Sequence, residues 1–472
     1  MRPKVVLYNP QAVFYTMPLA LLAVGSALDR EQYEVVIVDG RLEADPVGAV
    51  LAHLEGALCL GVSVLTGRPI YDALRVSRAV KAARPDLPVV WGGWHPSLFP
   101  RETLAEPSVD ITVIAQGEET FGEIVARLSR GERSMQGVAG CAFRCDGEIV
   151  VNPPRPLRDV NGLPPHDYAL IPVERYFVLK RGKRQLDYIS SQGCRFRCTF
   201  CADPYVYHRG WVGLAPERMG REIEALVRRY GVHEVAFQDE TFFTSRARVE
   251  AIADEFIRRR LEIVWTGTLR ADQGHRLDDH LLAKCVRSGL RRVMVGVESG
   301  SQEMLNRIKK DITLEQVWQT AEKCLRHKIG VIYNIIVGFP GESDESVAAS
   351  LDVAKRLRAM SPDFEVAIFF YKPYPGNPIA DDLLRQGYRF PQTLEEWAEF
   401  DYVAGRSEWV TEEKWRLVEN FKFYQRLAWG RNHNPLRWPF SLAARWRCQR
   451  DFYRFPVERA LVERLRPAAR LS

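Results

Sequence analysis

The chain has 472 residues, of which 46% are hydrophobic and 27% charged, and its formal net charge is +6. This length is more than one hydrophobic core usually organises, so two or three domains are expected. No run of about 18 apolar residues predicts a membrane-spanning helix, and no secretory signal follows Met1. Nine cysteines without such a signal favour a reducing compartment, so we expect a cytoplasmic protein.

Short apolar strands alternate with helical patterns in residues 1–151. The predicted strands are Val5–Tyr8, Val35–Val38, Leu58–Val64, Val89–Trp91 and Ile111–Ile114. Such a βα series predicts an α/β fold with a parallel, doubly wound, Rossmann-like sheet. Ligands of these sheets bind at the carboxyl ends of the strands, where this chain places Asn9, Ser63, Thr66, Gly92, Gly93 and His95. No GxGxxG motif opens the first helix, which weakens a dinucleotide-binding interpretation.

Residues 152–184 form a predicted linker. Six prolines between Pro153 and Pro172 punctuate it and prevent a long helix. Just before it, Cys141 to Cys145 is predicted to be the first arm of a hairpin that turns at Asp146-Gly147. The two cysteines are therefore interpreted as strand residues rather than ligands.

Three cysteines, Cys194, Cys198 and Cys201, then follow in a CxxxCxxC pattern. Four-iron clusters are normally held by four cysteine thiolates, so a compact set of three predicts an iron–sulfur cluster with one iron open to another ligand. A zinc site would require a second ligand pair at matching spacing, and none follows. The alternative is three unrelated buried thiols or one transient disulfide.

Residues 185–389 resume the alternation with longer helices. The predicted strands are Leu186–Ser190, Val235–Gln238, Ile263–Thr268, Arg292–Val297, Val331–Val337 and Val366–Phe370. Six βα repeats predict a second α/β domain, with the cluster loop after the first strand at the carboxyl face, and the family resemblance given below implies that this domain is an open (βα)6 partial TIM barrel. Later strand ends on that face carry Asp239 and Glu240, Arg270, and Glu298 with Ser299.

The last segment, residues 390–472, is predicted to be mainly helical. Residues 411–472 contain 14 Lys and Arg against 6 Asp and Glu, and six of the 11 tryptophans lie between Trp397 and Trp446. Arg with Trp at helical spacing suits a cap over the barrel, an anionic membrane surface or stacking on nucleic-acid bases. We favour a cap that gives access to an apolar or membrane-borne substrate, which would place the protein at the inner face of the membrane. Nucleic acid is the least favoured partner because no RNA-binding signature accompanies the charge.

The cysteine motif, with the aromatic Phe200 before its third cysteine, resembles that of the radical S-adenosylmethionine (SAM) enzymes. The resemblance implies a [4Fe–4S] cluster whose open iron binds SAM, and cleavage of SAM to a 5'-deoxyadenosyl radical after an electron arrives from a flavodoxin- or ferredoxin-type donor. It also implies that Asp239 and Glu240 serve the SAM amino group. Arg270 would pair with the SAM carboxylate, and Glu298 and Ser299 would serve its ribose and methionine ends.

The loop order of residues 1–151 resembles the cobalamin-binding domain that precedes the radical SAM core in one subfamily. That subfamily includes anaerobic magnesium-protoporphyrin cyclases and many methyltransferases. The resemblance places Asn9, Ser63 and Thr66 near the cofactor, and Gly92 and Gly93 where the backbone approaches its nucleotide tail. The DxHxxG cobalt-binding motif is absent after the first strand, so we expect cobalamin with its base displaced, and His95 in the nearby loop but not on cobalt.

The favoured function is a cobalamin-dependent radical SAM methyltransferase that acts on an unactivated carbon of a small-molecule or lipid substrate. The alternative is a non-methylating relative that performs cyclisation, oxidation or rearrangement. A cobalamin sensor or carrier would leave the cluster cysteines without a purpose. A tRNA methylthiotransferase would need a second cluster on Cys59, Cys141 and Cys145, which stand at strand and hairpin positions. The candidates for lining the substrate pocket are Tyr205, Trp211, Tyr371 and Tyr374.

Overall fold

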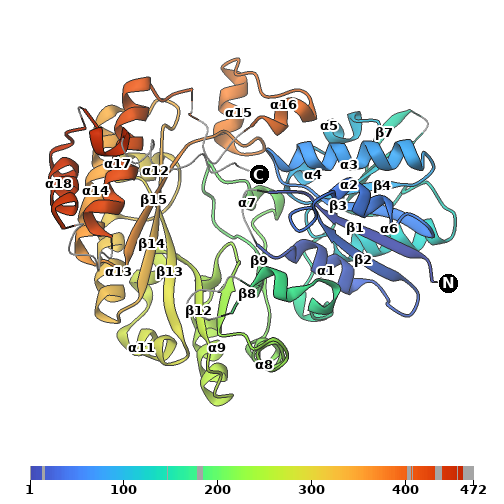
Figure 1. Ribbon diagram of the computed structural model, residues 1–472, viewed down its shortest axis with the longest axis horizontal. Coiled ribbons are helices and arrows are strands. Elements are labelled where there is room, and N and C mark those ends of the chain that lie inside the picture. Colours follow the sequence, from blue (N-terminus) through green and yellow to red (C-terminus); the bar gives the residue numbers. More distant parts are fainter. Residues whose placement is uncertain are drawn as a thin grey trace. The chain divides into compact units, whose positions relative to one another are not determined.

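The computed structural model describes residues 2–12, 16–145, 147–177, 184–400, 406, 408–430, 438–453 and 455–460. Their contacts divide the chain into two compact units, residues 1–265 with 373–401, and residues 266–372 with 402–472. Figure 1 follows the chain from blue at its start to red at its end. Among the described residues, no helix has the length and apolar character needed to cross a membrane.

The first unit begins with a seven-stranded sheet in the order β2-β1-β3-β4-β5-β6-β7. Strands β1 to β5 pair in parallel, as predicted, and the antiparallel β6 and β7 form the predicted hairpin. The strands are β1 (Lys4–Asn9), β2 (Glu34–Asp39), β3 (Ala57–Ser63), β4 (Val89–Gly92), β5 (Ile111–Val113), β6 (Cys141–Cys145) and β7 (Glu148–Val151). The strand order reverses between β1 and β3, which is where such sheets bind their ligands.

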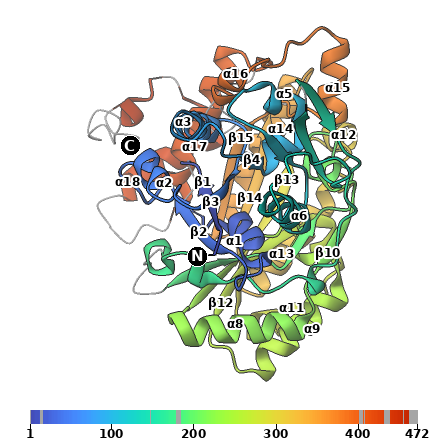
Figure 2. The ribbon, with the colours of Figure 1, turned by 90° about the vertical axis from the view of Figure 1, so that its right-hand side faces the viewer.

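Helices cover both faces of this sheet (Figure 2). Helix α1 (Leu19–Ala27) and helix α6 (Glu118–Ser129) pack together over one apolar core, while α2 (Pro46–Leu51) and α3 (Pro69–Ala83) enclose the other. Two short helices, α4 (Trp94–Leu98) and α5 (Pro100–Ala105), follow β4. The strands are buried on both sides, which explains why they read as continuous apolar runs.

The linker contains only three short 3-10 turns, η1 (Val160–Gly162), η2 (Tyr168–Leu170) and η3 (Val173–Tyr176), in its described part. It is attached to the start of α6, because Arg158 forms an ion pair of 2.6 Å with Glu119 and its backbone N–H donates to Gln116. The described part of the linker thus contains no long helix, as expected from its prolines.

A second sheet has the strand order β15-β14-β13-β12-β11-β8. Its strands are β8 (Gln185–Tyr188), β11 (Glu234–Phe237), β12 (Val264–Arg270), β13 (Leu290–Glu298), β14 (Gly330–Val337) and β15 (Phe364–Phe370), which confirms the six predicted strands. The border between the two units falls within β12. A small antiparallel ribbon of β9 (Ser191–Gly193) and β10 (Trp211–Gly213) was not predicted.

Helices follow the strands of the second sheet. The first unit contains α7 (Asp203–Val206), α8 (Pro216–Tyr230), η4 (Phe242–Thr244) and α9 (Arg246–Arg258). The second unit contains α10 (Ala271–Arg276), α11 (Asp279–Arg287), α12 (Gln302–Arg307), α13 (Leu314–Arg326) and α14 (Asp344–Met360). Helix α8 shows why helix boundaries can be predicted from sequence. Pro216 stands in its first turn, and Gly231 ends it with a φ of 62°.

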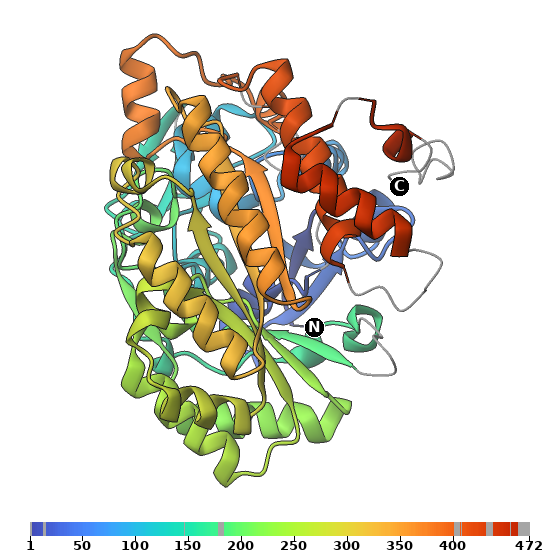
Figure 3. The same cartoon turned by 90° about the vertical axis from the view of Figure 1, so that its left-hand side faces the viewer.

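The segment predicted as one C-terminal cap is divided between the two units. Helix α15 (Pro378–Arg385) and helix α16 (Leu394–Ala398) belong to the first unit, where Trp397 packs on Phe99 and Phe390. Helix α17 (Glu412–Trp429) and helix α18 (Trp438–Arg450) belong to the second and lie side by side (Figure 3). Apolar side chains of α16 belong to the core of the N-terminal sheet.

Candidate active site

The three motif cysteines lie in the loop between β9 and α7. None forms a disulfide, Cys198 is buried, and Cys194 and Cys201 are partly exposed. The residue before the motif, Gly193, has a φ of 84°, and a Cβ there would stand 2.3 Å from the Gly210 carbonyl oxygen. Only glycine therefore allows β9 to approach the chain beyond the cluster loop this closely.

The thiols fit an iron–sulfur cluster. Burial raises the pKa of the Cys201 thiol well above its usual range, and the neighbouring Asp203, Cys198 and Cys194 raise it further. Bound iron would offset this rise in pKa, because a metal-bound thiol is deprotonated. Among the described side chains, no three His, Cys, Asp or Glu surround a single ion. A cluster does not require that arrangement, since its cysteines bind different irons.

Two elements hold the cluster loop in place. On one side, the Asn377 side chain before α15 donates to the Phe200 carbonyl oxygen at 3.3 Å, and the Ile379 N–H donates to the Thr199 carbonyl oxygen at 3.4 Å. On the other side, Asp239 after β11 accepts from the Ser190 N–H at 2.7 Å and from the hydroxyls of Ser190 and Ser191 at 2.6 Å each. Asp239 is buried and already holds the residues that lead into β9. Its predicted contact with SAM stays a prediction.

Glu240 differs from its neighbour Asp239. Its Oε2 atom is buried and has no hydrogen-bond partner among the described residues. Burial raises the pKa of this carboxyl group well above its usual range, and Asp203, close to the cluster cysteines, raises it further. A buried oxygen without a partner is costly, so it marks a place for a missing donor. Glu240 therefore fits the role predicted for it at the SAM amino group.

In the second unit, the other predicted SAM contacts also stand at strand ends. Arg270 ends β12 and donates to Asp272 at 2.9 Å and to the Lys310 carbonyl oxygen at 2.6 Å. Glu298 ends β13 with a φ of 67° and accepts from the Lys310 ammonium at 2.6 Å. The buried Ser299 hydroxyl lies 3.3 Å from that of Ser350. Lys310 and Ser350 were not predicted, because no sequence spacing links them to β13.

The N-terminal sheet has a cavity of about 260 Å³ at its carboxyl edge. Of the predicted cobalamin contacts, Ser63, Gly92 and Gly93 line it. Further lining comes from residues outside that list of predicted contacts, notably Leu65, Trp94, Ser97, Gln116, Glu118, Gln192, Val206 and Tyr207. Gly93 has a φ of 95°, and a Cβ there would stand 2.9 Å from the Val64 carbonyl oxygen. The glycine backbone and the amide side chains fit a ligand that, like cobalamin, carries many amide groups.

Asn9, Thr66 and His95 lie outside the lining of this cavity. Asn9 donates to Asp39 at 3.0 Å, and the Thr66 hydroxyl lies 3.3 Å from Nδ1 of His95. His95 is fully buried against Phe99 and Trp397, and burial lowers its pKa to about 3. The start of α4 explains this, because Trp94 and Ser97 share the helix face toward the cavity while His95 faces the core. The predicted absence of histidine from cobalt stays a prediction.

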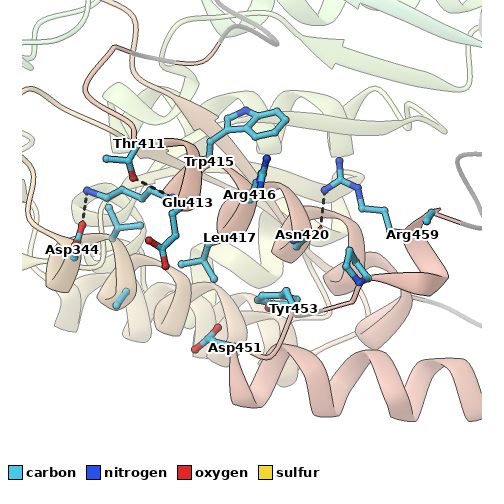
Figure 4. Close-up of a pocket in the computed structure, with 15 residues that line it drawn as sticks. Asp344, Thr411, Glu413, Trp415, Arg416, Leu417, Asn420, Asp451, Tyr453 and Arg459 are labelled. Atoms are coloured by element: carbon cyan, nitrogen blue, oxygen red, sulfur yellow. Dashed lines mark hydrogen bonds and ion pairs between the residues drawn. The ribbon is translucent and has the colours of Figure 1, made fainter.

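A larger cavity, of about 920 Å³, lies in the second unit between α14, α17 and residues 451–453 and 456–460 (Figure 4). An ion pair of 2.6 Å joins Lys414 to Asp344 at one end, and Arg459 donates to Asn420 at 3.0 Å at the other. The described lining contains none of the predicted cofactor contacts. Its charges are of both signs, which gives no preference for one class of ligand.

The fold and the cluster loop define the class of the protein, and comparison with known families confirms it. Residues 6–125 match the B12-binding domain, and residues 188–354 match the radical SAM superfamily. The chain belongs to the radical SAM enzymes that carry an N-terminal B12-binding domain. These domains imply a [4Fe–4S] cluster, SAM and cobalamin, as predicted.

Among curated proteins, the chain is 29% identical over 419 residues to an uncharacterized methyltransferase of Pyrococcus horikoshii, covering 87% of this chain and 88% of that one. It is 26% identical over 358 residues to the anaerobic magnesium-protoporphyrin IX monomethyl ester cyclase of Rubrivivax gelatinosus, covering 74% and 63%. It is 25% identical over 453 residues to the cytidylyl-2-hydroxyethylphosphonate methyltransferase of Streptomyces wedmorensis, covering 82% and 83%.

Two solved structures share the fold. One is the radical SAM methyltransferase TsrM from Kitasatospora setae, with cobalamin and a [4Fe–4S] cluster bound, at a TM-score of 0.69 and 19% identity, covering 82% of this chain and 75% of that one. The other is the cobalamin-dependent radical enzyme OxsB with aqua-cobalamin bound, at a TM-score of 0.74 and 17% identity, covering 95% and 72%. The predicted α/β fold class is confirmed.

Proposed function

We propose that the protein methylates an unactivated carbon of a small-molecule or lipid substrate. When bound, the cluster and SAM would supply a 5'-deoxyadenosyl radical, and cobalamin would carry the methyl group. One observation carries the proposal: Gln192 and Tyr207, on either side of the cysteine motif, line the cavity of the B12-binding domain. The residues that would hold the radical source thus border the site for the methyl carrier. The methyltransferases among the relatives support the same reaction.

The chain's own residues have three tasks in this proposal. Cys194, Cys198 and Cys201 hold the cluster, and Asp239 with Asn377 keeps their loop in place. Oε2 of Glu240, which has no hydrogen-bond partner among the described residues, accepts a hydrogen bond from the SAM amino group. Arg270 and the Glu298–Lys310 pair present ordered charges to the rest of SAM.

A second candidate function is cyclisation or oxidation without methyl transfer. The similarity to the magnesium-protoporphyrin cyclase favours it, since that relative carries a different activity on a similar chain. Both functions would consume SAM to 5'-deoxyadenosine. They differ in the second product, because removal of a methyl group from SAM leaves S-adenosylhomocysteine.

The test uses the full chain, reconstituted anaerobically with iron, sulfide and hydroxocobalamin, and supplied with SAM and a reductant. A methyltransferase forms both S-adenosylhomocysteine and 5'-deoxyadenosine, and a methylated product gains one methylene unit in mass. Formation of 5'-deoxyadenosine alone, with an isomer or a loss of hydrogens in the product, contradicts methyl transfer. A sensor or carrier would form neither. The variant Cys145→Ala, which loses a cysteine outside the motif, should form the same products as the wild type.

We also propose a flavodoxin- or ferredoxin-type electron donor. A small acidic redox protein would replace the chemical reductant in the same assay. Turnover with dithionite but not with reduced flavodoxin or ferredoxin would contradict this part.

The C-terminal segment is proposed to contact an anionic membrane. Seven of the fourteen exposed large hydrophobic side chains of the described chain lie there, namely Trp438, Phe440, Leu442, Trp446, Phe452, Phe455 and Val457. We call this set the exposed hydrophobic surface. Arg445 and Arg450 are exposed on the same helix, α18. Apolar side chains with cations beside them suit the interface of an anionic bilayer, where each basic residue contributes about 1 kcal/mol.

Co-sedimentation with vesicles of phosphatidylglycerol and phosphatidylcholine tests this contact. We expect binding at low salt, weaker binding as salt rises, and loss of binding in the variant Trp438→Ser, Phe440→Ser, Trp446→Ser. The control variant Tyr71→Ser, Leu384→Ser removes two exposed apolar side chains elsewhere and should bind normally. An intact protein that stays in the supernatant at low salt contradicts the membrane contact and leaves only a cap.

A further inference from the structure

We infer that Gln192 is a positioning residue that couples the cluster loop to the cobalamin cavity, so that an assembled cluster raises the affinity for cobalamin. The inference rests on the cofactors of the proposed function and adds an energetic link between their two sites. It is carried by a chain of hydrogen bonds, Gln116 to Gln192 to Glu118, in the first unit.

The distances define a continuous chain. The Gln116 side-chain amide donates to Oε1 of Gln192 at 2.7 Å, and the Gln192 amide donates to Oε1 of Glu118 at 3.0 Å. Gln116 and Glu118 stand where β5 leads into α6, and both are more than nine-tenths buried. Gln192 lies in β9, two residues before Cys194. A single side chain therefore connects the cysteine motif to the strand edge of the B12-binding domain.

The orientations of the Gln116 and Gln192 amides follow from their hydrogen-bond partners. The Arg158 backbone N–H donates to Oε1 of Gln116 at 2.7 Å, so the Gln116 oxygen faces the linker and its NH2 group faces Gln192. That NH2 group requires the oxygen of Gln192, whose own NH2 group then meets the carboxylate of Glu118. Reversal of any amide would oppose two donors or two acceptors. These hydrogen bonds thus specify one position of β9 relative to α6.

All three side chains also line the cobalamin cavity. Beyond the cysteine motif, Val206 and Tyr207 line it too, and the Tyr207 ring meets Trp94 edge to face with centroids 6.0 Å apart. The cluster loop is therefore bounded on both sides by residues of the cavity wall. Iron bound to the loop restricts the same residues that contact a ligand in the cavity. By linkage, cobalamin in the cavity must favour the ordered loop to the same extent.

The test measures binding of hydroxocobalamin, by equilibrium dialysis under anaerobic conditions, to the full chain with and without its cluster. We expect the cluster-loaded chain to bind about 5- to 10-fold more tightly, at the low end of usual coupling between sites. In Gln192→Ala the ratio should fall to about one, with unchanged iron content. The control Gln32→Ala, which removes a surface amide bonded to Asp29, should keep the wild-type ratio.

A second readout needs only the cluster-loaded chain and so does not depend on folding without iron. Hydroxocobalamin, added to the wild type with excess dithionite, which reduces the cobalamin to Co(II) and keeps the cluster reduced, should shift the electron paramagnetic resonance spectrum of the cluster, and the shift should be lost in Gln192→Ala. Equal affinities in both forms of the wild type, or a spectrum that shifts equally in Gln192→Ala, would overturn the inference. Absence of any cobalamin binding would instead overturn the proposed function itself.

Discussion

The strand ends of the two sheets use their polar side chains in different ways. In the N-terminal sheet, Ser63, Gln116 and Glu118 face a cavity, and a glycine backbone leaves room there. In the radical SAM core, Asp239, Arg270 and Glu298 are each engaged by buried protein partners. Strand-end position thus identifies where cofactors bind, but not which side chain is available to them. In the radical SAM core, a ligand is expected to contact polar atoms that the hydrogen-bond networks of the described residues leave without a partner. Oε2 of Glu240 is such an atom.

The largest expected effect comes from removing the proposed cluster ligands. Replacement of Cys194, Cys198 and Cys201 by Ala should reduce bound iron from about four per chain to near zero and abolish SAM cleavage. Iron analysis and chromatography of 5'-deoxyadenosine measure this. Retention of the iron in the triple variant would show that other residues hold the cluster.

The pair Asp239 and Glu240 separates a structural carboxylate from a ligand-binding one. Asp239→Ala removes the acceptor of three buried hydrogen bonds, so the free energy of unfolding should fall by about 3 kcal/mol. Glu240→Gln should unfold like the wild type but bind SAM about 10-fold more weakly, because a charge-assisted hydrogen bond is lost. Urea unfolding and SAM titration distinguish the two. Equal SAM affinity in Glu240→Gln and the wild type would contradict its assignment.

Two glycines test the cavity of the B12-binding domain. Gly93→Ala introduces a side chain at a φ of 95° and against the Val64 carbonyl oxygen, so we expect a loss of about 2 kcal/mol and weaker cobalamin binding. Gly122→Ala is the matched control, because a Cβ in that helix meets nothing within 4 Å and should stabilise the chain slightly. Thermal unfolding of both variants is the measurement. A Gly93→Ala variant as stable as Gly122→Ala would refute the close approach.

The smallest expected effect concerns pH. Burial lowers the pKa of His95 to about 3, whereas an unfolded histidine titrates near its ordinary value of about 6.5. Between these values the unfolded chain binds one proton more, so His95 lowers stability as pH falls, by about 1 kcal/mol per unit below pH 6. His95→Gln should reduce this dependence in urea unfolding between pH 7 and pH 5. An identical slope in the variant would mean that His95 is not buried as described.

Local patterns were sufficient to predict much of this molecule. The β-branched runs predicted both sheets, because strands are encoded by neighbouring residues. The CxxxCxxC spacing likewise predicted three cysteines in one loop, and their role as cluster ligands stays a prediction. Partners distant in sequence were missed. Gln192 meets Gln116 across 76 positions, and Asn377 meets Phe200 across 177. No periodicity relates such residues, and the burial of His95 depends on Trp397, which sequence alone placed in the tail.

The first unit is discontinuous in sequence, and this affects its biosynthesis. Residues 373–401 supply Asn377 to the cluster loop and Trp397 to the apolar core of the B12-binding domain. Chains are made from the N-terminus, so the ribosome releases every strand of the second sheet before the first unit can be completed. Truncation near residue 372 would therefore damage the first unit as well as the second, which loses α17 and α18. It also follows that the cluster loop gains its hydrogen bonds from Asn377 and Ile379 only after all strands of the two sheets have been synthesised.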